Sequence, residues 1–123
     1  MIHPILVLDD ERDLRVTYER LLRRQGYRVV HADSRHQGLS IVQAEPLALV
    51  ISDVRLSDGS GLDVVRAAQA APTRAPAIVV TGFPSLETRR AALDAGASGF
   101  LAKPFAASDF TELVRRVLGD RQV

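Results

Sequence analysis

Four short apolar runs in the sequence end in side chains that can bind or transfer a charged group. Asp9 and Asp10 follow the first run, and Asp53 follows the second. Thr81 and Lys103 follow the last two. Three carboxylates in one place repel one another and stay ionised only beside positive charge, which lysine and an oxygen-coordinated Mg²⁺ ion could supply. A carboxylate in such a site can act as a nucleophile towards phosphorus and form an aspartyl-phosphate.

Each of these residues also has a plainer interpretation. Aspartates after strands commonly form turns or begin helices, where the helix dipole favours them. Asp58 and Gly59 are expected to form only such a turn. Four strand ends that all carry charged or hydroxyl groups favour the shared site over four separate structural roles.

Lys103 is the only lysine among 16 lysine and arginine residues. A compact ammonium on a flexible stem can point one charge at a carboxylate or phosphoryl oxygen, whereas the wide guanidinium fork of arginine fits the same corner poorly. The next residue, Pro104, permits a cis peptide bond that would direct the lysine inward.

The elements that must position these groups alternate along the chain. Apolar runs predict strands at residues 5–8, 27–32, 48–52, 77–80 and 99–102. Four of them are continuously apolar, as in a parallel sheet covered on both faces, whereas 27–32 is mixed and suits an edge. Helical spacing relates Leu14 to Leu22, Leu39 to Val42, Leu62 to Val65, and Phe110 to Leu118, while 85–95 predicts a more polar helix.

This alternation predicts an α/β fold, a (βα)5 doubly wound five-stranded parallel sheet of order 2-1-3-4-5, which is flavodoxin-like. Strands 5–8 and 48–52 are then neighbours at the topological switch point, where such sheets bind ligands. The carboxyl ends of all strands lie at one edge, so the polar groups are expected to converge there.

Composition sets the class of protein. The chain has 123 residues, enough for one domain with a core, and it contains no cysteine, which excludes disulfides and thiolate chemistry. Its net charge of +1 gives no sign of nucleic-acid binding or of a membrane surface. The first apolar run is too short for a signal peptide or a membrane span, so we expect a cytoplasmic protein.

Four motifs resemble those of bacterial response-regulator receiver domains. They are "VLDDE" at 7–11, "ISDVRLSDGSGLDVV" at 51–65, "VVTGFPS" at 79–85 and "GFLAKPF" at 99–105. Their order and spacing match over essentially the whole chain. The resemblance implies a CheY-like fold and one receiver domain over residues 1–123, either standing alone or as the N-terminal part of a longer regulator.

The resemblance also implies a role for each site residue. Asp53 would be the phosphoacceptor of a two-component system. Asp10, Asp53 and the backbone carbonyl of Arg55 would bind Mg²⁺ directly, and Asp9 would bind it through water. Lys103 and Thr81 would contact the phosphoryl group.

In this family a sensor histidine kinase donates the phosphoryl group, and a surface change passes the signal on. Thr81 and Phe100 would be the switch residues. The last two helices and the strand between them would bind an effector domain or protein, and a homodimer formed on phosphorylation is a further option. The expected docking residues for the kinase are Asp13, Leu14, Thr17 and Phe105.

Two other functions stay open. A Mg²⁺-dependent phosphatase with an aspartyl nucleophile would usually carry an acidic residue two positions after it, where this chain has Arg55. An interaction module that resembles a receiver but is never phosphorylated would not need the Asp, Thr and Lys set. Arg55 and Phe83 are placed to impede an attacking water, which predicts a long-lived phosphoryl group. One departure from the family is Ser57, where a proline is usual.

Overall fold

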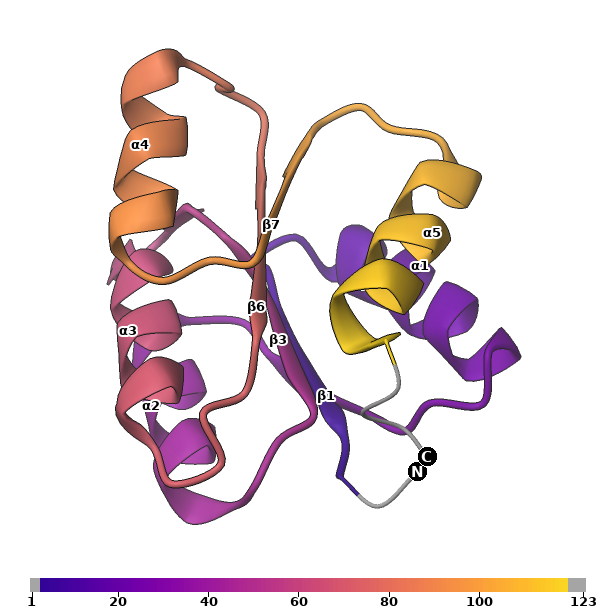
Figure 1. The fold of residues 1–123 in the computed structure, drawn as a ribbon, viewed down its shortest axis with the longest axis horizontal. Helices are drawn as coiled ribbons and strands as arrows, with labels where there is room; N and C mark the ends of the chain where they lie inside the picture. The colour runs from indigo at the N-terminus through magenta and orange to yellow at the C-terminus, as the bar shows by residue number, and fades with distance from the viewer. Residues whose placement is uncertain (1–2, 120–123) are drawn as a thin grey trace.

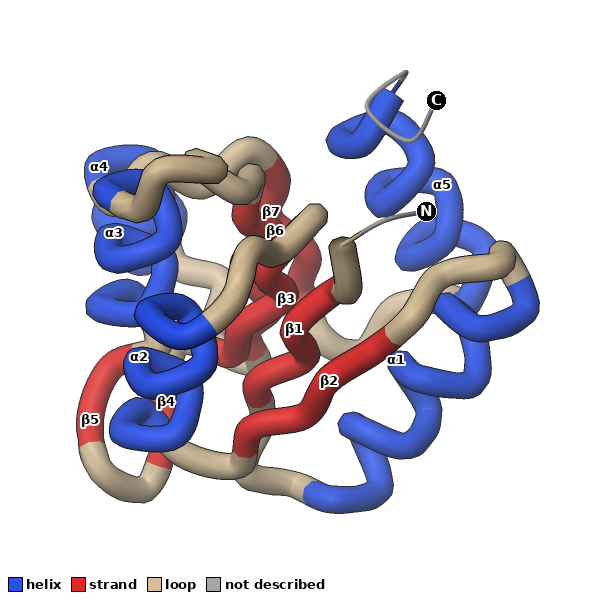
Figure 2. The backbone as a smooth tube through the Cα atoms, turned by 90° about the horizontal axis from the view of Figure 1, so that it is seen from below, coloured by secondary structure: helices blue, strands red, loops and turns tan. Residues whose placement is uncertain are grey.

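The computed structural model of the chain describes residues 3–119. Its centre is a five-stranded parallel sheet in the order β2-β1-β3-β6-β7 (Figure 1; β2 is labelled in Figure 2). The strands are β1 (Ile5–Leu8), β2 (Val29–Ala32), β3 (Leu49–Asp53), β6 (Ala77–Thr81) and β7 (Gly99–Ala102). The helices are α1 (Arg12–Arg24), α2 (Arg35–Ala44), α3 (Leu62–Ala70), α4 (Leu86–Asp94) and α5 (Ala107–Leu118). The predicted fold class and strand order are confirmed, with β2 at the edge as expected.

A hairpin between β3 and α3 was not predicted. The strands β4 (Arg55–Leu56) and β5 (Gly59–Ser60) pair antiparallel beside α2 (Figure 2). The turn that joins them is formed by Ser57 and Asp58, whereas Gly59, which was expected in the turn, begins β5. The carboxylate of Asp58 accepts hydrogen bonds from the backbone N–H groups of Arg35 at 2.7 Å and His36 at 2.9 Å. The hairpin thus satisfies two free N–H groups at the start of α2, which sequence periodicity does not reveal.

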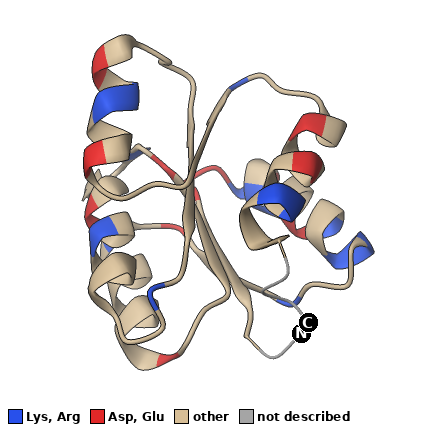
Figure 3. Ribbon diagram, in the orientation of Figure 1, with Lys and Arg blue, Asp and Glu red and all other residues tan. Residues whose placement is uncertain are grey.

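The helix α4 packs against the molecule through small side chains. Ala92 is its buried residue, whereas Leu86 is 73% exposed and Leu93 is 62% exposed. The serine at its start, Ser85, accepts a hydrogen bond from the Thr88 N–H at 3.0 Å. Both α4 and α5 carry acidic and basic residues (Figure 3).

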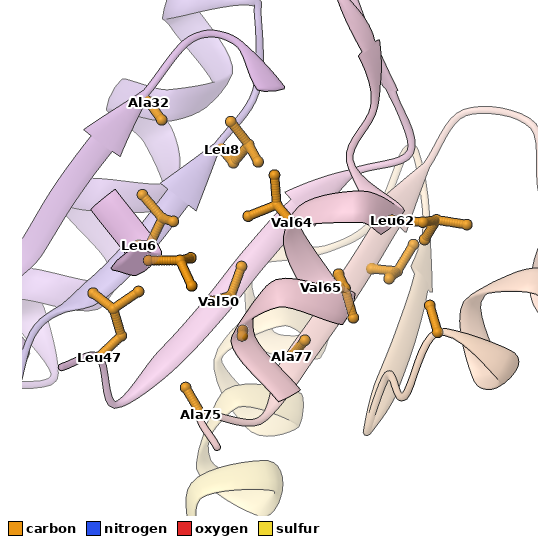
Figure 4. Packing of buried hydrophobic residues seen from close by; sticks show 14 of the residues in the cluster. Leu6, Leu8, Ala32, Leu47, Val50, Leu62, Val64, Val65, Ala75 and Ala77 are labelled. Carbon is orange, nitrogen blue, oxygen red and sulfur yellow. The ribbon is translucent and has the colours of Figure 1, made fainter. Parts of the chain in front are cut away.

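Two apolar cores lie on opposite faces of the sheet because successive strand residues point to opposite sides. Leu6 and Leu8 belong to the core beneath α2, α3 and α4, part of which is shown in Figure 4. Ile5 and Val7 belong to the core beneath α1 and α5. The predicted apolar faces of α1 and α5 supply Tyr18, Leu22 and the run Phe110 to Leu118 to that second core.

The helices of residues 3–119 are all too short or too polar to cross a membrane. The longest of them, α1, has 13 residues.

Candidate functional site

Strand register brings the predicted polar residues to one edge of the sheet. Leu8 pairs with Ser52, so Asp9 and Asp53 leave their strands side by side. Asp53 in turn pairs with Val80, and Thr81 pairs with Ala102, the residue before Lys103. Four separate strands therefore deliver two carboxylates, a hydroxyl and an ammonium to the same edge.

Lys103 joins the two carboxylates. Its Nζ donates to Oδ2 of Asp53 at 2.7 Å and to Oδ2 of Asp9 at 3.2 Å. The Lys103 side chain is 18% exposed, that of Asp53 12% and that of Asp9 1%, so the ion pairs are shielded from bulk water. The Lys103–Pro104 peptide bond is cis, and the Lys103 backbone N–H donates to the Thr81 carbonyl at 2.8 Å.

Burial and neighbouring charges shift the pKa values of Asp9 and Lys103 in this cluster. Burial raises the pKa of Asp9 above its ordinary value, although the Glu11 N–H and the charge of Lys103 act in the opposite direction. Burial alone would lower the pKa of Lys103, but the hydrogen bond to Asp53 and the charges of Asp9 and Asp53 raise it. The ammonium therefore stays charged at neutral pH, and the shorter of its two bonds goes to Asp53.

The backbone around Asp53 is held by a close approach of Gly61. The Gly61 N–H donates to the Val54 carbonyl at 2.8 Å. A Cβ atom at residue 61 would lie 1.8 Å from the Asp53 carbonyl oxygen and 2.3 Å from Oγ of Ser52. Only glycine allows this contact, which fixes the start of α3 against the end of β3.

Asp10 lies apart from this ion-paired cluster. It is exposed, and it enters none of the ion pairs found among residues 3–119. In the same residues, no three or more His, Cys, Asp or Glu side chains are grouped so as to hold a metal ion. The expected convergence of three carboxylates is thus seen for Asp9 and Asp53, between which Lys103 lies.

The donor set nevertheless suits a hard cation. Asp9, Asp10, Asp53 and the Arg55 carbonyl offer oxygen atoms only, which Mg²⁺ prefers. One ammonium faces the two carboxylates of Asp9 and Asp53, so a further positive charge is electrostatically favourable. The Arg55 N–H donates to Oδ1 of Asp53 at 3.3 Å, which keeps this residue beside the carboxylate.

Two aromatic residues lie near Thr81 in the chain or on the neighbouring strand: Phe83 is two residues after it, and Phe100 is on β7, where it pairs with Val79. Oγ1 of Thr81 accepts from the Phe83 N–H at 3.0 Å, and Thr81 is 2% exposed. The Phe83 ring is 63% exposed, and the Arg55 guanidinium lies 4.5 Å from its centre. Phe100 is half-buried, and the guanidinium of Arg89 lies 5.7 Å from its ring.

The expected docking residues lie on α1 and on the loop that follows β7. Asp13 and Thr17 are exposed, and Leu14 is half-buried. Phe105 is also half-buried because its ring stacks on Tyr18 at 6.0 Å and on Phe110 at 5.7 Å. Tyr18 lies on the apolar helix face that the spacing of Leu14 and Leu22 predicts, but the sequence pattern gave no sign of this aromatic stack.

Comparisons with known proteins agree with this geometry. The response regulator receiver domain family matches residues 5–115. The chain belongs to this family. The receiver domain is the phosphoacceptor of two-component signalling, phosphorylated on an aspartate, and is not an enzyme in the usual sense.

Relatives and solved structures show how far the likeness extends. The receiver domain is 37% identical over 113 residues to the response regulator protein PilR of Pseudomonas aeruginosa, covering 92% of this chain and 25% of PilR. A CheY-like receiver domain protein from Methanospirillum hungatei has a TM-score of 0.91 at 28% identity, covering 99% of this chain and 98% of that one.

A third similar protein carries the modification itself. It is a response regulator from Burkholderia pseudomallei whose structure contains a phosphorylated aspartic acid, a calcium ion and citrate. Its TM-score is 0.83 at 29% identity, covering 98% of this chain and 71% of that one. The receiver domain spans 25% to 60% of the length of the curated relatives it matches.

Proposed function

We propose that Asp53 accepts the phosphoryl group in this receiver domain. The observation that carries the proposal is the 2.7 Å bond between Nζ of Lys103 and Oδ2 of Asp53. It places a fixed positive charge beside the one carboxylate that ends the central strand β3 at the topological switch point.

The transfer itself makes few demands on the chain. A carboxylate oxygen of Asp53 forms the new P–O bond while the P–N bond of a phosphohistidine breaks, and the leaving imidazole takes up a proton. Lys103 holds its ammonium where charge develops on the phosphoryl oxygens. The Thr81 hydroxyl accepts from the Phe83 N–H, so its own hydrogen is free to donate to a phosphoryl oxygen.

Asp10, Asp53 and the Arg55 carbonyl would hold Mg²⁺ directly, with Asp9 acting through water. When bound, the ion would neutralise negative charge on the carboxylates and on the incoming phosphoryl group. The all-oxygen donor set and the excess of carboxylate over ammonium support this assignment.

The signal would pass from Asp53 to the surface through Thr81 and Phe100. Drawing the Thr81 hydroxyl towards the phosphoryl group breaks its bond with the Phe83 N–H and leaves room for Phe100 to turn inward. The face formed by α4, β7 and α5 then favours a different effector or a second copy of the chain. Phosphorylation biases an equilibrium between two existing conformations.

The phosphoryl donor would be a sensor histidine kinase docked over α1 and the loop after Lys103. Exchanging Asp13, Leu14, Thr17 and Phe105 for the residues of another receiver should redirect kinase preference and leave labelling by acetyl phosphate intact. Because Phe105 stacks on Tyr18, the exchanged set must keep an aromatic residue there. If kinase preference did not change, these four residues would not be the docking site of the kinase.

The decisive experiment is the intact mass of the protein after incubation with acetyl phosphate and Mg²⁺. Wild type should gain one phosphoryl group, Asp53→Asn none, and the exposed control Asp33→Asn one. Labelling of Asp53→Asn, or no labelling of wild type, would contradict the proposal. Continuous release of inorganic phosphate with rapid turnover would instead favour the phosphatase alternative.

A further inference from the structure

Tyr18 has a polar group that the fold does not use. Its side chain is 2% exposed and packs from α1 against α5 and the loop after Lys103. The ring stacks on Phe110 at 5.2 Å and on Phe105 at 6.0 Å. Its hydroxyl is the one buried side-chain polar atom of residues 3–119 that has no hydrogen-bond partner from the protein.

A phenylalanine would serve the packing equally well. It would make the same stacks without the free-energy cost of burying an unpaired hydroxyl, so the hydroxyl weakens the unphosphorylated fold. The unpaired Tyr18 hydroxyl raises the free energy of the unphosphorylated protein. We therefore expect this hydroxyl to form a hydrogen bond in another state of the protein.

The position of Tyr18 indicates which partner that is. Side chains on a helix lean towards its N-terminus, and α1 starts directly after the Asp9–Asp10–Glu11 segment, so the Tyr18 ring leans towards the phosphoacceptor edge. Burial raises the pKa of the Tyr18 hydroxyl, and the charges of Lys103, Asp9 and Asp53 also act on that pKa. Phe105, on which the Tyr18 ring stacks, follows Lys103 by two residues, so the phenol lies beside the chain segment that carries the ammonium.

Lys103 has a donor to spare. An ammonium has three N–H groups, and the two bonds found for Nζ go to Asp53 and Asp9. When Asp53 becomes an acyl phosphate, the ammonium must turn towards the phosphoryl oxygens, and its geometry relative to the carboxylates changes.

We propose that Tyr18 is a positioning residue for phosphoryl transfer: its buried hydroxyl accepts a hydrogen bond from the Lys103 ammonium when that ammonium turns to the phosphoryl group. The proposal rests on Asp53 being the phosphoacceptor. The aromatic stack of Phe105 and Phe110 holds the phenol in place, so the lysine is guided without any movement of α1.

The first test compares Tyr18→Phe with the matched control Tyr27→Phe. Tyr27 packs against the same core but lies in the loop that follows the C-terminal end of α1. The rate constant for labelling by acetyl phosphate with Mg²⁺ should fall roughly tenfold in Tyr18→Phe, as expected for losing a hydrogen bond to a charged group, and stay unchanged in Tyr27→Phe. The urea midpoint of unphosphorylated Tyr18→Phe should be equal to or above that of wild type.

The second test is spectroscopic. The chain has no tryptophan and two tyrosines, so in Tyr27→Phe the ultraviolet emission comes from Tyr18 alone. That emission should change on phosphorylation, and it should not change when Asp53→Asn is added. An emission that is the same before and after would mean that Tyr18 has only a packing role.

The outcomes separate the two proposals. If wild type gains no phosphoryl group, the phosphoacceptor assignment fails and this inference fails with it. If wild type is labelled, the Tyr18 role alone is overturned by any one of three results: an unchanged rate in Tyr18→Phe, an unchanged Tyr18 emission, or a lowered urea midpoint of unphosphorylated Tyr18→Phe.

Discussion

Asp9 is a buried carboxylate whose burial outweighs its ion pair with Lys103. Its pKa is raised in the folded protein, so as pH rises the unfolded chain loses its proton first. The contribution of Asp9 to the free energy of unfolding is therefore fully present below pH 3.8, the ordinary pKa of aspartate. This contribution is lost as pH rises through the pKa of Asp9 in the folded protein.

Replacing Asp9 with asparagine prevents this loss of stability at high pH, because asparagine does not ionise. We expect Asp9→Asn to raise the free energy of unfolding at pH 7 by about 1 kcal/mol, because a buried negative charge is removed while Lys103 keeps its shorter bond to Asp53. The gain should shrink as pH falls towards 3.8. Urea unfolding at a series of pH values measures it, with Asp33→Asn as an exposed control that stays level. If the gain in free energy of unfolding did not vary with pH, it would not come from the charge of Asp9.

The Arg55 guanidinium lies over the Phe83 ring, and we infer that the two side chains cover the proposed phosphoacceptor, Asp53. We expect Phe83→Ala to shorten the lifetime of the acyl phosphate by roughly a factor of ten, about 1.4 kcal/mol of barrier, because water gains a path to phosphorus. Loss of the phosphoryl mass with time measures this. Leu86→Ala removes a similarly exposed apolar side chain on α4 and should leave the lifetime unchanged. Equal lifetimes for wild type and Phe83→Ala would exclude the cover.

At the scale of single residues, the sequence predicts which residues can do chemistry better than it predicts which side chains touch. Asp9, Asp53, Thr81 and Lys103 were placed together because parallel register alone carries them to one edge. Two other features depend on how the helices pack on that sheet, namely the Arg89–Phe100 contact and the unpaired Tyr18 hydroxyl. Hydrophobic periodicity predicts neither of them.

At the scale of elements, α4 is the helix with the weakest attachment. It buries one alanine, and its first turn depends on Ser85. The helix α2 has the same kind of cap at Ser34, which accepts from the Gln37 N–H at 3.1 Å, but α2 is also tied to the hairpin through Asp58.

These two serines make a matched pair. Each Ser→Ala change should remove about 1 kcal/mol of capping energy. In Ser85→Ala the loss should appear as about fivefold faster hydrogen exchange in α4 at an unchanged urea midpoint, because α4 opens locally. In Ser34→Ala it should lower the urea midpoint, because α2 opens only with the whole domain. Similar behaviour of the two variants would show that α4 is as firmly held as α2.

The main strands and helices follow from hydrophobic pattern, whereas the β4–β5 hairpin does not. Four continuous apolar runs and one mixed run predicted the sheet and its edge, and each strand end differs by at most two residues from the structure. The hairpin strands have two residues each and are held by Asp58 on α2, a contact between segments distant in sequence.

At the scale of the whole molecule, one sheet separates two cores. Because the strands are shared, loss of either core should unfold both faces together. Leu8→Ala in the first core and Leu22→Ala in the second should each cost about 3 kcal/mol. Both tyrosines lie on the second core, so their emission follows that face while circular dichroism follows all helices. Coincident urea transitions are expected in both variants, and separate transitions would show independent faces.

The single ammonium side chain at the phosphoacceptor edge has a practical consequence. Since Lys103 is the only lysine and its Nζ lies 2.7 Å from Oδ2 of Asp53, isotopically labelled lysine would put one magnetic resonance probe in the entire chain, beside the proposed phosphoacceptor. Its frequency would follow metal binding, phosphoryl gain and phosphoryl loss in real time, with no resonance assignment needed.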